Sequence, residues 1–252
     1  MLLDKLKVEF IGTFLCTFFT GMGLVLYRLQ AEDVNALMLS VFVIFTICCW
    51  AARLISMGQF NPAVSLALVV SRHQKPRSGL FIAGTQVIAC ISAVSVLLLC
   101  VSPEVVSIVS QNAMIGLPVS QRGFFVIFAS EAFGTFLVVF AFYALVVERN
   151  SPKHVYAPAL GGLYAVLTKS LLGSSGAVLS PARTIAYVLA SRNVSNIAPL
   201  LLGQVLGLLL GAVLGNLILS EKAEITRVRR KSEKRARRES QVKNIVKGIT
   251  PA

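Results

Sequence analysis

Asn61-Pro62-Ala63 and Ser180-Pro181-Ala182 are two similar tripeptides that lie 119 residues apart, and Arg183 directly follows the second. The sequence upstream of each tripeptide is also repeated. Residues 9–15 (EFIGTFL) return 122 residues later as residues 131–137 (EAFGTFL). Two landmarks at nearly one offset indicate that the chain is one pattern written twice.

Two glutamines support the duplication. Gln86 and Gln204 each lie in an apolar run behind a nearby glycine, and they are 118 residues apart. We therefore expect two repeat halves, at about 1–101 and 123–219. Duplicated halves in an apolar chain are typical of channels and transporters, whose sites lie where the repeats meet.

The composition is that of an integral membrane protein. Of 252 residues, 56% are hydrophobic and only 14% are charged, against roughly a quarter charged in soluble domains. Apolar runs that reach about 20 residues, enough to span a bilayer, lie near 8–27, 35–54, 79–101, 123–147, 156–173 and 197–219. Two shorter apolar runs, 61–71 and 181–191, follow the tripeptides. The sequence thus predicts an all-α membrane protein with six transmembrane helices and two re-entrant half-helices, in one domain over 1–220.

The C-terminal segment, residues 221–252, is strongly basic, with 11 Lys/Arg against 4 Asp/Glu. A nucleic-acid partner is disfavoured because the segment has no aromatic side chain to stack on bases. Basic residues after a last span instead mark a cytoplasmic tail near anionic lipid. An even number of spans then predicts that both termini are cytoplasmic, with plasma and intracellular membranes left undecided. Three spans per half predict that the second half is inverted relative to the first.

Each tripeptide has the chemistry of a helix start. Proline is tolerated at the first helical position, and the Asn61 or Ser180 before it is a favourable N-cap. Two half-helices that enter from opposite faces would meet at the midplane with free N–H groups and a partial positive charge. We therefore expect a water-filled pore whose centre repels cations and orients neutral, hydroxyl-bearing molecules.

Glu9 and Glu131 are carboxylates inside predicted spans, where charge is costly and often functional. Two interpretations remain open. They relay protons, or they brace the re-entrant loops by accepting otherwise unpaired backbone N–H groups. Bracing is favoured because each half has one such loop to hold.

An enzymatic role has little support. The two histidines, His73 and His154, fall in predicted loops, and neither a triad nor a metal-binding spacing is evident. We expect no cofactor and no metal.

The motifs together resemble those of the aquaporin, or major intrinsic protein, family. The resemblance rests on Glu9-x-x-x-Thr13, residues 58–64 (GQFNPAV), Glu131-x-x-x-Thr135 and Pro181-Ala182-Arg183, and it covers roughly residues 6–219. It implies one pore per subunit within six helices and two half-helices, and usually a homotetramer.

The resemblance also implies a four-residue selectivity filter. Ungapped counting from the tripeptides places three members at Val41, or Phe42 if the register slips, at Thr168 and at Ala177, and the arginine member is Arg183. Strict water channels of the family usually carry an aromatic residue and a histidine at the first two positions. We therefore expect a wider and less polar opening here, with Arg183 as the fixed charge.

Departures from the family pattern mark an unorthodox member. Ser180 replaces the second asparagine; we expect it still to cap its helix, with one O–H donor in place of an NH₂ group. Lys169 follows Thr168 within an apolar run, and we favour an outward-snorkelling side chain over one that lines the pore.

Ser232 and Ser240 lie in Arg-Arg-x-Ser sequences within the basic tail, which resemble sites of basophilic kinases. Phosphate at these residues would release the tail from anionic lipid. The alternative is a basic tail that is never modified.

The leading functional hypothesis is a passive channel for water and small neutral solutes such as glycerol or hydrogen peroxide, which excludes ions. An alternative from another class is a membrane-organising or adhesion protein on the same scaffold, with low permeability. A third is weak ion leakage through a loosened midplane.

Overall fold

The structure is a computed structural model that describes residues 2–101, 123–147, 154–192 and 194–218. Residues Met1–Gly215 form one compact unit and Asn216–Ala252 a second. Ser232 and Ser240, with the rest of the predicted tail, lie outside the described residues, as does most of the loop between the two halves.

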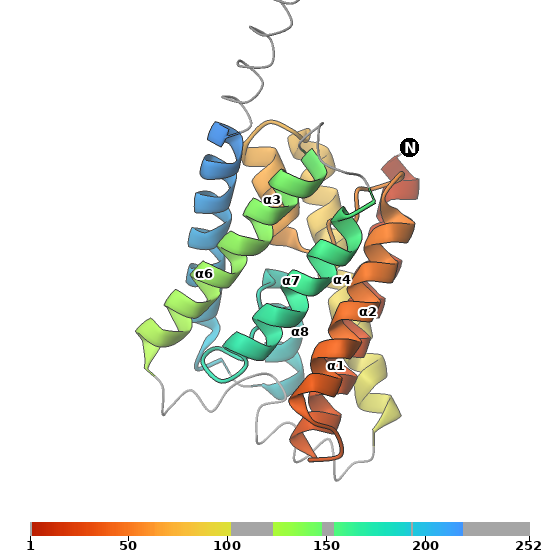
Figure 1. The fold of residues 1–252 in the computed structure, drawn as a ribbon, viewed down its shortest axis with the longest axis vertical. Helices are drawn as coiled ribbons and strands as arrows, with labels where there is room; N and C mark the ends of the chain where they lie inside the picture. The colour runs from red at the N-terminus through yellow and green to blue at the C-terminus, as the bar shows by residue number, and fades with distance from the viewer. Residues whose placement is uncertain (1, 102–122, 148–153, 193, 219–252) are drawn as a thin grey trace, which may run out of the picture. The chain divides into compact units, whose positions relative to one another are not determined.

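The described residues form helices and no strand. In chain order these are α1 (Leu2–Arg28), α2 (Val34–Ala52), α3 (Pro62–Val70), α4 (Pro76–Cys100), α6 (Phe124–Phe142), the π-helical η2 (Tyr143–Val147), α7 (Tyr156–Leu171), α8 (Pro181–Ser191) and a last helix, Ile197–Ile218. Two long helices, one short helix and one long helix therefore follow one another in each half (Figure 1). The all-α prediction is confirmed, and the short helices begin at Pro62 and Pro181.

Five of the described helices are long and apolar enough to cross a membrane: α1, α2, α4, α6 with η2, and the last helix. The predicted fifth span, α7, has only 16 residues, about 24 Å at 1.5 Å per residue. Its apolar run continues past Leu171 into a turn, which is why the sequence pattern reads longer than the helix.

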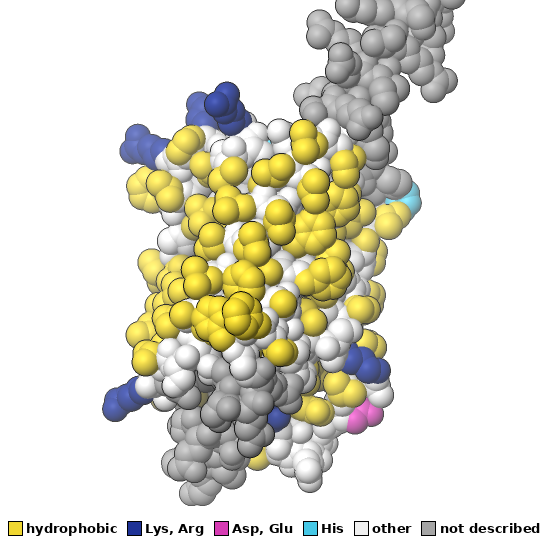
Figure 2. All heavy atoms as spheres, turned by 90° about the vertical axis from the view of Figure 1, so that its left-hand side faces the viewer, with side chains coloured by type: hydrophobic (Ala, Val, Ile, Leu, Met, Phe, Trp, Pro, Cys, Tyr) yellow, Lys and Arg dark blue, Asp and Glu magenta, His cyan; other side chains and the backbone are white. Residues whose placement is uncertain are grey.

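The surface supports a lipid environment. Large apolar side chains are left exposed, among them Leu54 (87%), Leu99 (85%), Phe125 (80%) and Trp50 (67%). Figure 2 shows one face on which hydrophobic side chains cover the middle, while Lys and Arg side chains lie near the two ends. Soluble monomeric proteins rarely expose so many large apolar side chains together, so this surface suits contact with lipid.

Glycines let the long helices approach closely. A Cβ on Gly161 of α7 would lie 2.7 Å from the carbonyl oxygen of Phe42 on α2. On the last helix, a Cβ on Gly203 or Gly207 would lie 2.5 or 2.4 Å from a backbone oxygen of α6. Small residues at such spacing are how helices pack in membranes, where van der Waals contact replaces hydrophobic burial as the driving force.

The two short helices occupy corresponding places. α3 packs against α4 and α6, α8 packs against α4, and α3 and α8 also contact each other. In Figure 1, α3 lies in the upper part of the first unit and α8 in the lower part. The C-terminal end of α3 is held by Tyr143, whose hydroxyl donates to the carbonyl of Ala67 at 2.8 Å.

Candidate functional site

Asn61 is the N-cap of α3 and joins the two halves of the chain. Its Oδ1 accepts the backbone N–H of Ala63 at 2.9 Å, while its Nδ2 donates to the carbonyl of Leu179 at 2.7 Å and to the hydroxyl of Tyr164 at 3.3 Å. Leu179 directly precedes Ser180, the N-cap of α8. The amide of one half therefore touches the backbone that leads into the other half-helix.

Ser180 has the extended backbone of an N-cap, with φ −150° and ψ 121°, close to the −152° and 122° of Asn61. Its side chain, however, makes no capping hydrogen bond. The expectation that the Ser180 hydroxyl caps α8 is therefore wrong. Its Oγ is buried without a partner among the described residues, so the hydroxyl keeps its full hydrogen-bonding capacity at the centre of the molecule.

Glu9 is fully buried and accepts from the loop that precedes α3. Its Oε1 accepts the N–H of Gln59 at 2.9 Å, and its Oε2 accepts the N–H of Phe60 at 2.8 Å and Nε2 of Gln86 at 2.8 Å. Each partner is a donor, which suits the acceptor-only chemistry of an ionised carboxylate.

Glu131 repeats this arrangement in the second half. Its Oε1 accepts the N–H of Val178 at 3.0 Å and the hydroxyl of Ser175 at 2.6 Å, and its Oε2 accepts the N–H of Leu179 at 2.7 Å and Nε2 of Gln204 at 2.7 Å. The duplicated sequence is therefore matched by a duplicated hydrogen-bond network.

Gln86 and Gln204 extend both networks to the short helices. The Oε1 of Gln86 accepts from Ser65 at 3.1 Å, and that of Gln204 accepts from Thr184 at 3.2 Å. In the sequence these glutamines served only as markers of the repeat. Their common offset, together with their place in apolar runs, was a signal that each has a polar partner to satisfy.

Both loops before the half-helices use backbone conformations that favour glycine. Positive φ occurs at Gly58 (66°) and Phe60 (47°) in the first loop, and at Ala177 (52°) and Leu179 (54°) in the second. Left-handed backbone costs a residue with a Cβ about 1 kcal/mol or more. The bonds to Glu9 and Glu131 offset this cost, since N–H groups of both loops are bonded to them.

The four residues that the resemblance placed in a filter are all buried: Val41 on α2, Thr168 on α7, Ala177 in the loop before α8, and Arg183 on α8. Lys169, by contrast, is exposed and donates to Oδ1 of Asn35 at 2.8 Å. Its side chain therefore points away from the buried Thr168, as the outward alternative predicts.

An aromatic pair that the motifs did not single out lies beside Asn61. Phe45 on α2 and Tyr164 on α7 are stacked, with ring centroids 4.0 Å apart and an interplanar angle of 23°. Both are buried, and the hydroxyl oxygen of Tyr164 accepts the hydrogen bond from Nδ2 of Asn61. Aromatic residues on helices usually read as core packing, so the sequence alone gave them no functional weight.

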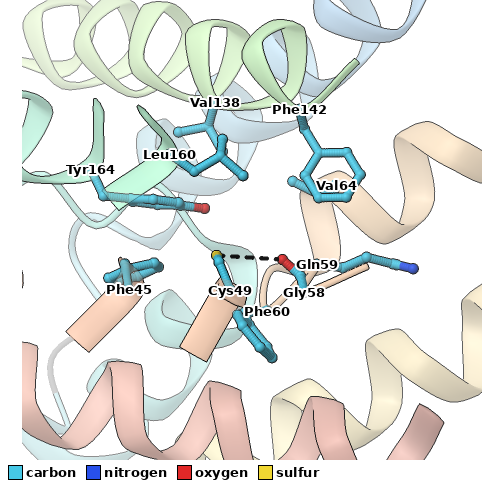
Figure 3. A pocket seen from close by; sticks show the side chains of 10 residues that line it. All are labelled: Phe45, Cys49, Gly58, Gln59, Phe60, Val64, Val138, Phe142, Leu160 and Tyr164. Carbon is cyan, nitrogen blue, oxygen red and sulfur yellow. Dashed lines mark hydrogen bonds between the residues drawn. The ribbon is translucent and has the colours of Figure 1, made fainter. Parts of the chain in front are cut away.

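A small cavity of about 10 Å³ lies next to this pair, roughly the room for one water molecule. Its polar wall includes Gln59, and Phe45 and Tyr164 lie at one end of it, one ring over the other (Figure 3). Among the described residues no group of His, Cys, Asp or Glu is arranged to hold a metal ion.

Residues 2–218 match the model of the family described as major intrinsic protein. The chain belongs to this family. It is therefore a membrane channel protein and not an enzyme, as the sequence predicted.

Individual relatives agree with this assignment. Glycerol uptake facilitator protein-like 6 of Lactiplantibacillus plantarum is 30% identical over 186 residues, which cover 72% of this chain and 81% of that protein. Aquaporin NIP2-1 of Zea mays is 28% identical over 208 residues, covering 82% of this chain and 68% of that protein. The X-ray structure of the aquaglyceroporin from Plasmodium falciparum has the same fold, with a TM-score of 0.68 at 15% identity, over 86% of this chain and 95% of that one.

Proposed function

We propose that this protein is a passive channel for water and small neutral solutes, with glycerol and hydrogen peroxide as candidate permeants. The observation that carries the proposal is the meeting of the two half-helix starts, where Asn61 donates to the carbonyl of Leu179 next to Ser180. Helix N-termini that converge in this way concentrate partial positive charge, because each carries backbone N–H groups without an intrahelical acceptor. Neutral hydroxyl compounds are oriented there, and cations are repelled.

Glu9 and Glu131 are proposed to brace the re-entrant loops. Each accepts two consecutive backbone N–H groups in a loop that has no helical or sheet partner for them. Within a membrane an unpaired N–H costs several kcal/mol. A proton relay is not favoured, because the described hydrogen-bond partners of both carboxylates are backbone N–H groups, glutamine amides and a serine hydroxyl, and none of these is a titratable side chain.

Val41, Thr168, Ala177 and Arg183 are proposed to form the selectivity filter. Three of the four have small or medium side chains, which leaves room for a solute with a carbon skeleton. Arg183 supplies a fixed cation and hydrogen-bond donors. On these grounds both water and glycerol are expected to pass through the filter.

The assembly and its orientation are proposed from the family and from the sequence. A homotetramer with one pore per subunit is expected, with both termini on the cytoplasmic side of a plasma or intracellular membrane. Phosphorylation of Ser232 and Ser240 in the basic tail over 221–252 is a proposed switch of its contact with anionic lipid.

The channel proposal is tested with the purified full chain in lipid vesicles, by stopped-flow measurement of osmotic water flux, glycerol flux and peroxide entry. Rates above those of empty vesicles are expected. Thr168→Phe should reduce glycerol flux more than water flux, because it narrows the filter. Lys169→Phe is the matched control, since that adjacent side chain is exposed. Fluxes of all three permeants equal to those of empty vesicles would contradict the proposal.

A membrane-organising protein of low permeability is the second candidate. The stacked rings of Phe45 and Tyr164 beside Asn61 favour low permeability, because they fill space between the two halves. It predicts clustering of vesicles that carry the protein, together with flux at the level of empty vesicles. Clustering is measured by dynamic light scattering at increasing protein-to-lipid ratios. Dispersed vesicles with solute flux would exclude it.

A further inference from the structure

We propose that the Phe45–Tyr164 stack is an aromatic barrier across the conducting path at the level of Asn61, and that it sets the permeability and size limit of the channel. This proposal rests on the proposed channel function. The two rings come from different halves of the chain, Phe45 from α2 and Tyr164 from α7. They meet face to face at 4.0 Å.

The hydrogen bonds of Asn61 place the barrier at the centre. A side-chain amide has two N–H donors, and the Nδ2 of Asn61 uses them on the carbonyl of Leu179 and the hydroxyl of Tyr164. Its Oδ1 is used by the N–H of Ala63. In this arrangement the asparagine has no donor left for a permeant, because Tyr164 occupies the position that a water molecule would take.

The cavity shows how the path is interrupted. It has room for about one water molecule, and the rings of Phe45 and Tyr164 form part of its wall, as Figure 3 shows. Its remaining wall is largely apolar and includes Val64, Val138 and Leu160. Tyr164 thus lies in the wall of the cavity while its hydroxyl accepts from the Asn61 amide.

Ser180, which follows the Leu179 carbonyl that accepts from Asn61, provides an independent observation that a permeant could bind here. Ser180 is only 2% exposed, and its hydroxyl has no hydrogen-bond partner among the described residues. A buried hydroxyl without a partner is costly, and a water or solute hydroxyl would satisfy it. When Tyr164 swings aside, Asn61 regains a donor and a permeant can bond to both N-cap residues of the two half-helices.

Ordinary core packing is the competing explanation, and the two differ in what they predict for flux. If the rings only fill space, smaller side chains lower stability and leave the permeability of the folded protein unchanged. If they block the path, smaller side chains raise permeability and admit larger solutes. The solute size dependence is the decisive readout, because a loss of stability does not change it.

The test uses the full chain reconstituted in vesicles at equal protein-to-lipid ratio, with water and glycerol fluxes measured by stopped flow. Tyr164→Val is expected to raise water flux about tenfold, equivalent to about 1.4 kcal/mol of barrier, and to raise the ratio of glycerol flux to water flux. Tyr164→Phe keeps the ring and should stay within about twofold of the parent, since loss of one neutral hydrogen bond has a small net effect. Phe133→Val is the control, because Phe133 is an aromatic residue that is 57% exposed on α6.

Phe45→Leu provides a second variant if Tyr164→Val does not fold as judged by gel filtration and circular dichroism. It removes the stack and keeps an apolar side chain, so it should also raise flux and the glycerol-to-water ratio. If all variants conduct like the parent at rates above empty vesicles, the pair is core packing and the barrier proposal is overturned while the channel stands. If parent and variants all match empty vesicles, the channel function fails, and the barrier proposal with it.

Discussion

Replacing Glu131 by alanine is expected to destabilise the protein severely, and the structure gives the size of the effect. The change removes the acceptor for four donors, two of which are the backbone N–H groups of Val178 and Leu179. These two have no other partner to take up, because their loop precedes a helix and is buried. At about 1–3 kcal/mol for each buried donor left unpaired, the two backbone groups alone give a loss of roughly 4 kcal/mol. That is a large part of the 5–15 kcal/mol typical of whole proteins.

The free energy of unfolding is measured by equilibrium denaturation in detergent micelles, for Glu131→Ala, Glu131→Gln and the parent. Glutamine keeps one acceptor oxygen but turns an NH₂ group toward donors, so it should lose about half as much as alanine. Glu32→Ala is the control, since Glu32 is an exposed loop residue, and it should stay within about 0.5 kcal/mol of the parent. Glu9→Ala should match Glu131→Ala because it loses the corresponding bonds. A loss below about 0.5 kcal/mol for Glu131→Ala would refute the bracing argument.

Three further changes test other parts of the fold. Ala177→Gly should stabilise the protein by about 0.5 kcal/mol in the same assay, since glycine relieves the positive φ of 52°; a loss of stability would contradict this. Gly207→Leu should cost at least about 2 kcal/mol by forcing the last helix from α6, whereas Gly84→Leu, whose Cβ meets nothing within 4 Å, should be nearly neutral; equal effects would refute the close packing. Arg183→Val in a Tyr164→Val background should admit cations in planar bilayers, while Tyr164→Val alone carries no current; identical currents would place the ion barrier elsewhere.

The sequence was sufficient for the architecture because the relevant signals are local or repeated. Proline after an N-cap residue fixes the start of a short helix, and the half-helices begin at Pro62 and Pro181 as predicted. The apolar runs predict the long helices, although the run 156–173 is longer than α7 because it includes the start of a turn after Leu171. The buried glutamates could be paired with the loops because the number of loops equals the number of glutamates.

Two features of the candidate site could not be read from the sequence, for different reasons. The unpaired hydroxyl of Ser180 is a matter of rotamer and neighbours, whereas N-cap statistics describe only the residue type. The stack of Phe45 on Tyr164 joins residues 119 positions apart. That separation equals the offset of the two tripeptides, so the rings occupy equivalent places in the two halves, but only the three-dimensional contact shows that they meet.

The contrast between Asn61 and Ser180 explains why the barrier needs only one polar contact. Asparagine has two donors, so one can hold the backbone of the opposite half at Leu179 while the other holds Tyr164. Serine has a single hydroxyl, which is left free for a permeant. An asparagine at position 180 would instead offer an amide with two N–H donors. The N-cap residue of the first half thus contributes the hydrogen bond to the Tyr164 hydroxyl. The N-cap residue of the second half contributes a hydroxyl that a permeant could bind.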